Sequence, residues 1–150
     1  MKAFSGNIEL RVPGRAEYVS IVRTFVTDLA RRLGMSASAV EDVQVAVSEA
    51  CTNAISHAYS DDQHEREVIV RCSVNDGGLM MEIADSGQGF CETIDQPPSQ
   101  TEKDGGFGLV LIRNLMENVS LDSSTERGTV VRMSKKTDRS RIRRSEVRTL

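Results

Sequence analysis

Apolar and polar residues alternate in five short segments of the chain, and a period of two is typical of β-strands with one buried face. These segments are residues 8–12, 68–74, 79–83, 119–121 and 130–133. The second and third flank the turn sequence Asn75-Asp76-Gly77-Gly78. Asn and Gly adopt the positive φ angles that tight hairpin turns require. The pattern therefore predicts a hairpin centred on this turn.

Three other segments repeat their apolar residues every three or four positions, which predicts helices with one core-facing side. They span about Ala16–Leu33, a stretch ending near Ala58, and Leu109–Met116. Gly34 follows the first helix as a C-cap. Ser36 or Ser38 can cap the second, and Glu41, three residues after Ser38, would complete a capping box.

The order of these elements is strand, helix, helix, strand, strand, loop, helix, strand, strand. It predicts an α+β fold, a two-layer α/β sandwich with helices on one face of a largely antiparallel sheet. We expect one such domain over residues 1–134. The loop from Asp85 to Gly108 holds seven Gly and Pro in 24 residues. A loop this long is usually functional or mobile, so we expect a mobile lid from about Cys91 to Gly105.

Charge is distributed unevenly. The net charge is −3, and residues 135–150 carry seven basic and two acidic side chains, so the rest of the chain carries −8. An acidic body argues against a nucleic-acid-binding fold. We expect residues 135–150 to form a basic, disordered tail, either simply solvated or in contact with a partner. No apolar run is long enough to span a membrane and the N-terminus lacks a signal-peptide core, so we expect a cytoplasmic protein without a membrane contact.

Three cysteines, Cys51, Cys72 and Cys91, are widely spaced and form no C-x-x-C motif. This pattern predicts reduced structural thiols rather than disulfides or a zinc site. The chain has only two histidines, which also argues against a metal site built from protein ligands alone.

Glu49, Asn53 and His57 follow one another at intervals of four in the second predicted helix. At about 100° per residue they form a polar stripe beside the apolar side of that helix. One interpretation is a solvated helix face. The other is a functional site, because Asn is a poor helix former and small residues surround it here.

Two glycine-containing strings come later in the chain. Asp85-Ser86-Gly87-Gln88-Gly89 directly follows a predicted strand, and Gly105-Gly106-Phe107-Gly108 opens the third helix. A carboxylate at a strand end can accept a hydrogen bond from a ligand amine, and glycines before a helix can expose N–H groups to phosphate. Each string alone also fits an ordinary turn or a flexible connector.

The order of the three strings is more specific than any one of them. A helix with E-x-x-x-N, a strand ending in D-x-G-x-G, a Gly-rich loop and a helix opened by G-x-G resemble the GHKL (Bergerat-fold) ATPases. The sequences VSEACTNAISHAY, DSGQGF, GGFGLVLIRNLMENV and DSSTERGTVVRM are similar to those of the anti-sigma factor serine kinases of bacterial sporulation and general stress response. The resemblance covers residues 8–135.

This resemblance implies a role for each matching polar residue. Asn53 would hold Mg²⁺ against the triphosphate of ATP, and Glu49 would accept the proton of an incoming serine hydroxyl. Asp85 would accept a hydrogen bond from the adenine amino group, and Thr129 would support that contact. His57 would either line the phosphate end of the site or pack as a structural residue.

The resemblance also gives the glycines a purpose. Gly87 and Gly89 would leave room for the adenine and ribose, and Gly106 and Gly108 would let the lid flex and present N–H groups to the phosphates. The implied cofactors are ATP and Mg²⁺.

The implied activity is an ATP-dependent protein serine kinase that phosphorylates a STAS-domain anti-anti-sigma protein and sequesters a sigma factor. Relatives of this kind imply a homodimer. Two alternatives remain open from the sequence: a nucleotide-gated binding module without catalysis, and a switch kinase that binds no sigma factor. The carboxylate of Glu49 favours an active kinase over the binding module.

Overall fold

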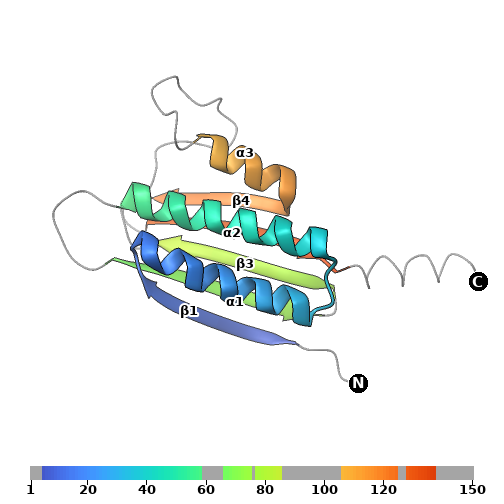
Figure 1. Ribbon diagram of the computed structural model, residues 1–150. Helices are drawn as coiled ribbons and strands as arrows, with labels where there is room; N and C mark the ends of the chain where they lie inside the picture. The colour runs from blue at the N-terminus through green and yellow to red at the C-terminus, as the bar shows by residue number, and fades with distance from the viewer. Residues whose placement is uncertain (1–4, 59–65, 76, 86–105, 125–127, 138–150) are drawn as a thin grey trace, which may run out of the picture.

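The computed structural model describes residues 5–58, 66–75, 77–85, 106–124 and 128–137. These residues form a single sheet with the helices packed against one face (Figure 1). The strands are β1 (Gly6–Pro13), β2 (Glu67–Asn75), β3 (Gly78–Asp85), β4 (Glu117–Ser124) and β5 (Gly128–Lys136). The helices are a short 3₁₀ turn (Ala16–Tyr18), α1 (Val19–Arg32), α2 (Ala37–Ala58) and α3 (Gly106–Leu115).

The sheet has the strand order β1-β2-β3-β5-β4. Each of its four neighbouring pairs is antiparallel. The hairpin predicted around Asn75 joins β2 to β3, and a second short connection joins β4 to β5. The predicted fold class, a two-layer sandwich with a largely antiparallel sheet, is confirmed.

The turn between α1 and α2 explains where α1 ends. Gly34 has a φ angle of 76°, the left-handed conformation that favours glycine. Its N–H donates to the carbonyl of Arg31, and the N–H of Met35 donates to the carbonyl of Ala30. These two bonds make a Schellman motif, so the predicted C-cap at Gly34 is confirmed.

The start of α2 differs in detail from the sequence prediction. The hydroxyl of Ser36 accepts a hydrogen bond of 3.1 Å from the N–H of Ala39, so Ser36 is the N-cap. Ser38 lies inside α2, and the capping box predicted between Ser38 and Glu41 was wrong. The Schellman turn buries Met35 and leaves Ser36 as the residue at the helix entrance.

The core lies between the sheet and the helices. Alternate residues of β2, from Val68 to Val74, point towards the helices and are buried. The buried residues Val43, Ala46, Val47 and Ala50 of α2 complete the core from the helix side, where α2 packs chiefly over β3 and β5. The small side chains of α2 allow it to lie close to the strands, between α1 and α3 (Figure 1).

Strand β5 extends through Lys136, two residues beyond the domain boundary expected at residue 134. Lys135 points to the helix side, where its Nζ lies 2.9 Å from Oδ2 of Asp42 and donates a 2.6 Å hydrogen bond to the carbonyl of Leu115. Lys135 therefore belongs to the folded domain rather than to the predicted tail. Residues 138–150 lie outside the described part of the chain.

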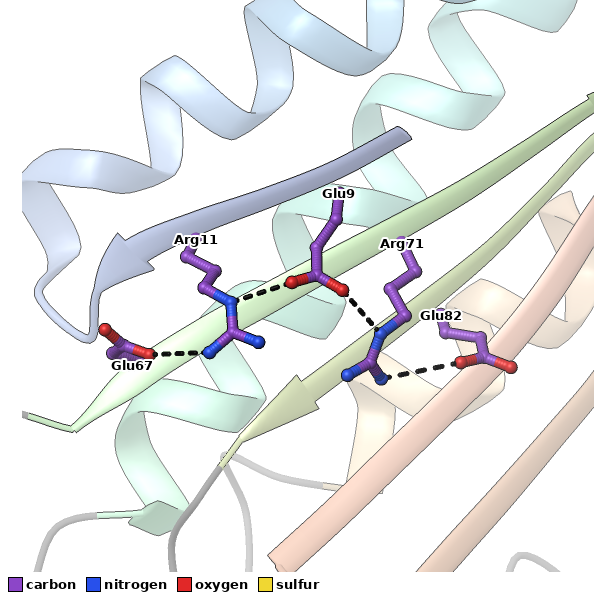
Figure 2. A network of polar contacts seen from close by, with 5 residues as sticks. All are labelled: Glu9, Arg11, Glu67, Arg71 and Glu82. Carbon is purple, nitrogen blue, oxygen red and sulfur yellow. Dashed lines mark hydrogen bonds and ion pairs between the residues drawn. The ribbon is translucent and has the colours of Figure 1, made fainter. Parts of the chain in front are cut away.

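The face of the sheet that carries no helix is charged. Glu9 accepts hydrogen bonds from Nε of Arg11 at 2.7 Å and Nε of Arg71 at 2.9 Å. Glu67 and Glu82 extend this row of alternating charges across the strands (Figure 2). The hydrogen bond from Arg11, and to a smaller extent the one from Arg71, holds the pKa of Glu9 below its usual range. All of these side chains are partly or largely exposed, so the row adds little stability.

Among the described residues, no helix combines the length and the apolar character needed to cross a membrane.

Candidate functional site

The seam between α2 and α3 brings together three of the residues singled out in the sequence. A Cβ atom built on Gly108 would lie 2.8 Å from Nδ2 of Asn53 and 3.1 Å from Oε2 of Glu49. Real Cβ contacts are rarely so short, so the first turn of α3 rests directly on these two side chains. Glu49 and Asn53 of the polar stripe therefore contact α3 and do not form a solvated helix face.

Lys135 fixes the other end of the same seam. It binds Asp42, near the start of α2, and the carbonyl of Leu115, at the end of α3. Because Gly108 contacts the second half of α2, the helices α2 and α3 run in opposite directions. A cation at the C-terminus of α3 also complements the negative end of the helix dipole.

Asp85 and Thr129 form a second polar group at the strand ends. Ala84 pairs with Val130 across β3 and β5, so Asp85, which follows Ala84, lies beside Thr129, which precedes Val130. Both point to the helix side of the sheet, and both are 5% exposed. A carboxylate and a hydroxyl are thus buried next to each other where the two strands end.

These two groups occupy the same end of the domain. Lys135 of β5 contacts Asp42 of α2. From there β5 leads back about 20 Å to Thr129, and α2 leads about 16 Å to Asn53. Figure 1 shows the end of α2, the end of β3 and the start of α3 together at this end of the molecule.

Comparison with known proteins assigns this arrangement to a family. Residues 12–135 match the histidine kinase-like ATPase domain. The chain belongs to this family. Within it, the chain is 39% identical to the serine-protein kinase RsbW of Oceanobacillus iheyensis over an aligned length of 137 residues, and the match covers 85% of this chain and 85% of the relative. It is 38% identical to that of Bacillus subtilis, over 90% of this chain and 88% of the relative. The chain is thus a member of the RsbW serine-protein kinases.

Solved structures share the fold of the ATPase domain. A structure of RsbU and RsbW domains from Mycobacterium tuberculosis matches with a TM-score of 0.65 at 19% identity, covering 88% of this chain and 32% of that one. A histidine kinase domain from Erythrobacter litoralis matches with a TM-score of 0.56 at 22% identity, covering 85% of this chain and 62% of that one. The predicted family is confirmed by the family match and the relatives, and these structures support the predicted fold.

Some predicted site residues fall outside the described part of the chain. Gly87 and Gly89 are among them, as is the predicted lid from Cys91 to Gly105. Gly106 is the first residue of α3. His57 lies in the last turn of α2, and its side chain is not among those that the structure describes.

The surroundings of Gly108 give a further reason for a glycine at this position. Lid flexibility and phosphate contact were the predicted reasons for a glycine there. In addition, Gly108 lies inside α3 and is buried against Asn53 and Glu49. A glycine at this position is needed for the close approach of the two helices.

The donor atoms of the seam fit a hard cation. The amide oxygen of Asn53 and the carboxylate of Glu49 both lie against Gly108, and oxygen ligands are those that Mg²⁺ prefers. The described residues contain no group of three or more His, Cys, Asp or Glu that could hold a metal ion. A magnesium ion at such a site commonly takes further ligands from phosphate and water.

Cys51 lies on α2 between Glu49 and Asn53 in sequence but points into the core. Burial raises the pKa of Cys51 to about 12, and burial likewise raises the pKa of Cys72 to about 12. Thiols with such values hold almost no thiolate near neutral pH. For these two cysteines, neither of which is disulfide-bonded, the structure supports the predicted structural role.

Proposed function

We propose that the protein uses ATP and Mg²⁺ to phosphorylate a serine of a STAS-domain anti-anti-sigma protein, and that it sequesters a sigma factor when it is not bound to that substrate. The observation that carries the proposal is the seam, where a carboxylate and an amide oxygen meet at the start of α3. The similarity to serine-protein kinases named RsbW supports it.

In this proposal the adenine end and the phosphate end of ATP contact different residues. The buried carboxylate of Asp85 accepts a hydrogen bond from the adenine amino group, with Thr129 beside it. A hydrogen bond to a charged acceptor in a buried site is stronger than a neutral one. Gly87 and Gly89 border the adenine and ribose. Gly106 and Gly108 belong to the start of α3, where backbone N–H groups favour phosphate.

The magnesium ion would neutralise charge on the phosphates during transfer, and the side-chain oxygen of Asn53 would help to hold it. Glu49, which keeps part of its surface exposed, accepts the serine proton. The serine oxygen forms a bond to the γ-phosphorus, the bond from that phosphorus to the β–γ bridging oxygen breaks, and ADP leaves. The hydroxyl proton becomes acidic late in such a reaction, so an ordinary carboxylate suffices as its acceptor.

The decisive experiment is to incubate the protein with ATP, Mg²⁺ and a STAS-domain protein encoded by the same genome. Intact-mass measurement should show one added phosphoryl group on the STAS protein, and none when ATP is replaced by ADP. Sigma-factor binding should be measured in parallel, with and without nucleotide. Nucleotide-dependent sigma-factor binding without any phosphoryl transfer would favour the binding module instead.

We also propose that two copies associate through the helix-free face of the sheet. Met80 is 52% exposed there and lines a hollow of about 340 Å³ together with Arg71, Ser73 and Glu82. An apolar side chain surrounded by charged ones is typical of an interface centre and its rim. Sedimentation should give about twice the monomer mass of 16.5 kDa, and Met80→Glu should lower it. A monomer mass for the wild type at micromolar concentration would contradict this proposal.

A further inference from the structure

Two exposed apolar side chains lie along the seam between α2 and α3. Val45 of α2 is 39% exposed and Leu111 of α3 is 36% exposed. Val45 precedes Glu49 by four residues, and Leu111 follows Gly108 by three. Residues at these spacings share a helix face. Both side chains therefore lie one helical turn from the contact between Glu49 and Gly108, and we call them the apolar step.

The antiparallel course of the two helices places both residues at the same level of the seam. The contact of Gly108 with Glu49 marks one end, and Lys135, bound to both helices, marks the other. Val45 and Leu111 lie between these two ends on their respective helices. The apolar step thus separates the candidate catalytic carboxylate from a paired, neutralised charge.

The short distance between the apolar step and Glu49 suggests that the protein substrate covers the step. Four residues of helix span about 6 Å, and an extended chain advances about 3.3 Å per residue. A serine whose hydroxyl reaches Glu49 therefore brings residues about two positions away over Val45 and Leu111. A protein substrate cannot approach the carboxylate along this seam without covering these side chains.

We propose that the apolar step binds an apolar side chain of the protein substrate, about two residues from the accepting serine. This inference rests on the proposed function, since it assumes that Glu49 receives the serine proton. Lys135 and Asp42, beyond the step, neutralise each other. The substrate residue that lies next to this pair therefore does not have to be charged. The step is then a determinant of substrate choice, separate from nucleotide binding.

The test uses the double variant V45S/L111S, ATP with Mg²⁺, and the STAS-domain protein that the wild type phosphorylates. The KM for the STAS protein should rise at least tenfold, whereas kcat, the affinity for ATP and the melting temperature should change little. The matched control is Ile21→Ser. Ile21 is 51% exposed on α1, which is separated from α3 by α2 (Figure 1), so this variant should leave the KM unchanged.

A second arm changes the substrate. Each apolar residue within three positions of the accepting serine is replaced in turn by Asp. One of these substrate changes should strongly raise the KM of the wild-type kinase. The same change should raise the KM of V45S/L111S only slightly, because the effects of interacting residues are not additive. Leu111→Gln, which keeps the side-chain length and helix propensity, repeats the measurement in a variant with minimal risk to folding.

Three outcomes would overturn the inference. The KM could be the same in V45S/L111S, in Leu111→Gln and in the wild type. The affinity for ATP could fall instead of the KM rising, which would mean that the step serves nucleotide binding rather than substrate choice. If the wild type transfers no phosphate, the proposed kinase function is wrong, and the inference is then tested by binding alone. Equal affinity of the STAS protein for nucleotide-loaded wild type and double variant, or no measurable binding to either, would then overturn the inference as well.

Discussion

Gly108 of α3 lies so close to Asn53 of α2 that a Cβ atom at position 108 would be 2.8 Å from Nδ2 of Asn53. The Nδ2 atom is at the end of a side chain, so it can move, but Asn53 is buried and has little space to move into. The structure thus makes the size of residue 108 a determinant of the orientation of Asn53.

We therefore predict that Gly108→Ala separates function from stability. Alanine is more favourable than glycine in a helix by about 1 kcal/mol, which offsets much of the cost of the contact, so the melting temperature should change by only a few degrees. The displaced Asn53 should weaken ATP binding in the presence of Mg²⁺ at least tenfold. Calorimetry with ATP and Mg²⁺, beside a thermal melt, measures both effects.

The double variant Asn53→Ala/Gly108→Ala is the control for this prediction. Removing the side chain that the new Cβ meets should relieve any loss of stability, and the affinity should fall no further than in Asn53→Ala alone. If the two single changes add in full, Gly108 acts independently of Asn53 and the close contact does not explain its effect.

Asp85→Asn is predicted to weaken adenine nucleotide binding more than tenfold, which corresponds to at least about 1.4 kcal/mol. The change keeps the shape of the side chain but replaces one acceptor oxygen by a donor and removes the charge. Asp122→Asn makes the same chemical change on the exposed part of β4 and should leave the affinity unchanged. Calorimetry that shows wild-type affinity in a folded Asp85→Asn protein would contradict the adenine contact.

Much of this site could be predicted from local sequence patterns. The period of four predicted that Glu49 and Asn53 share a helix face, and the alternation before Asp85 predicted its place at a strand end. Both signals arise within one element, where backbone geometry fixes the spacing of the side chains. The contact with Gly108 joins residues of two elements that are more than 50 positions apart in the sequence, and no local pattern encodes such a packing distance.

Lys135 shows how composition can hide a structural residue. Thr129, Val131, Met133 and Lys135 alternate on the helix side of β5, so the strand period already includes the lysine. The basic residues that follow outweighed this signal in the sequence interpretation. A lysine can occupy such a position because its apolar stem packs while its charged end reaches Asp42 and Leu115.

Lys135→Met is accordingly predicted to destabilise the domain by about 1.5–3 kcal/mol, the usual contribution of a hydrogen bond to a charged group. The lysine is 17% exposed and its partner Asp42 is 30% exposed, so water replaces the lost contacts only in part. Arg32→Met removes the partner of Asp28 in an exposed pair on α1 and serves as the control. Urea unfolding should show a clear loss of stability for the first variant and no measurable one for the second, and equal losses would argue against a structural role for Lys135.

The buried thiols give a prediction about reactivity. With pKa values raised to about 12 by burial, Cys51 and Cys72 should not react with Ellman's reagent in the native protein at pH 8. In a Cys91→Ser variant, no protein thiol should react rapidly before denaturant is added. After denaturant is added, two thiols should react. Rapid reaction in the native state would show that one of these side chains becomes accessible through local opening.

The last prediction separates catalysis from binding at the seam. Glu49→Gln preserves size and hydrogen bonding but removes the proton acceptor, so ATP should still bind and phosphoryl transfer should fall by roughly 10²–10⁴-fold. Asn53→Ala removes an oxygen ligand for Mg²⁺, so it should weaken ATP binding, phosphoryl transfer and nucleotide-dependent sigma-factor capture together. Capture should survive in Glu49→Gln, because it requires the nucleotide-bound state but no chemistry.

The two variants are compared by measuring ATP affinity with and without Mg²⁺, STAS-protein phosphorylation and sigma-factor binding on the same preparations. Asn53→Ala should bind ATP like the wild type when Mg²⁺ is absent, which controls for general damage to the site. Glu49→Gln that phosphorylates at the wild-type rate would exclude Glu49 as the proton acceptor. Glu49 and Asn53 both lie against Gly108, so the comparison tests two neighbouring side chains of the same seam.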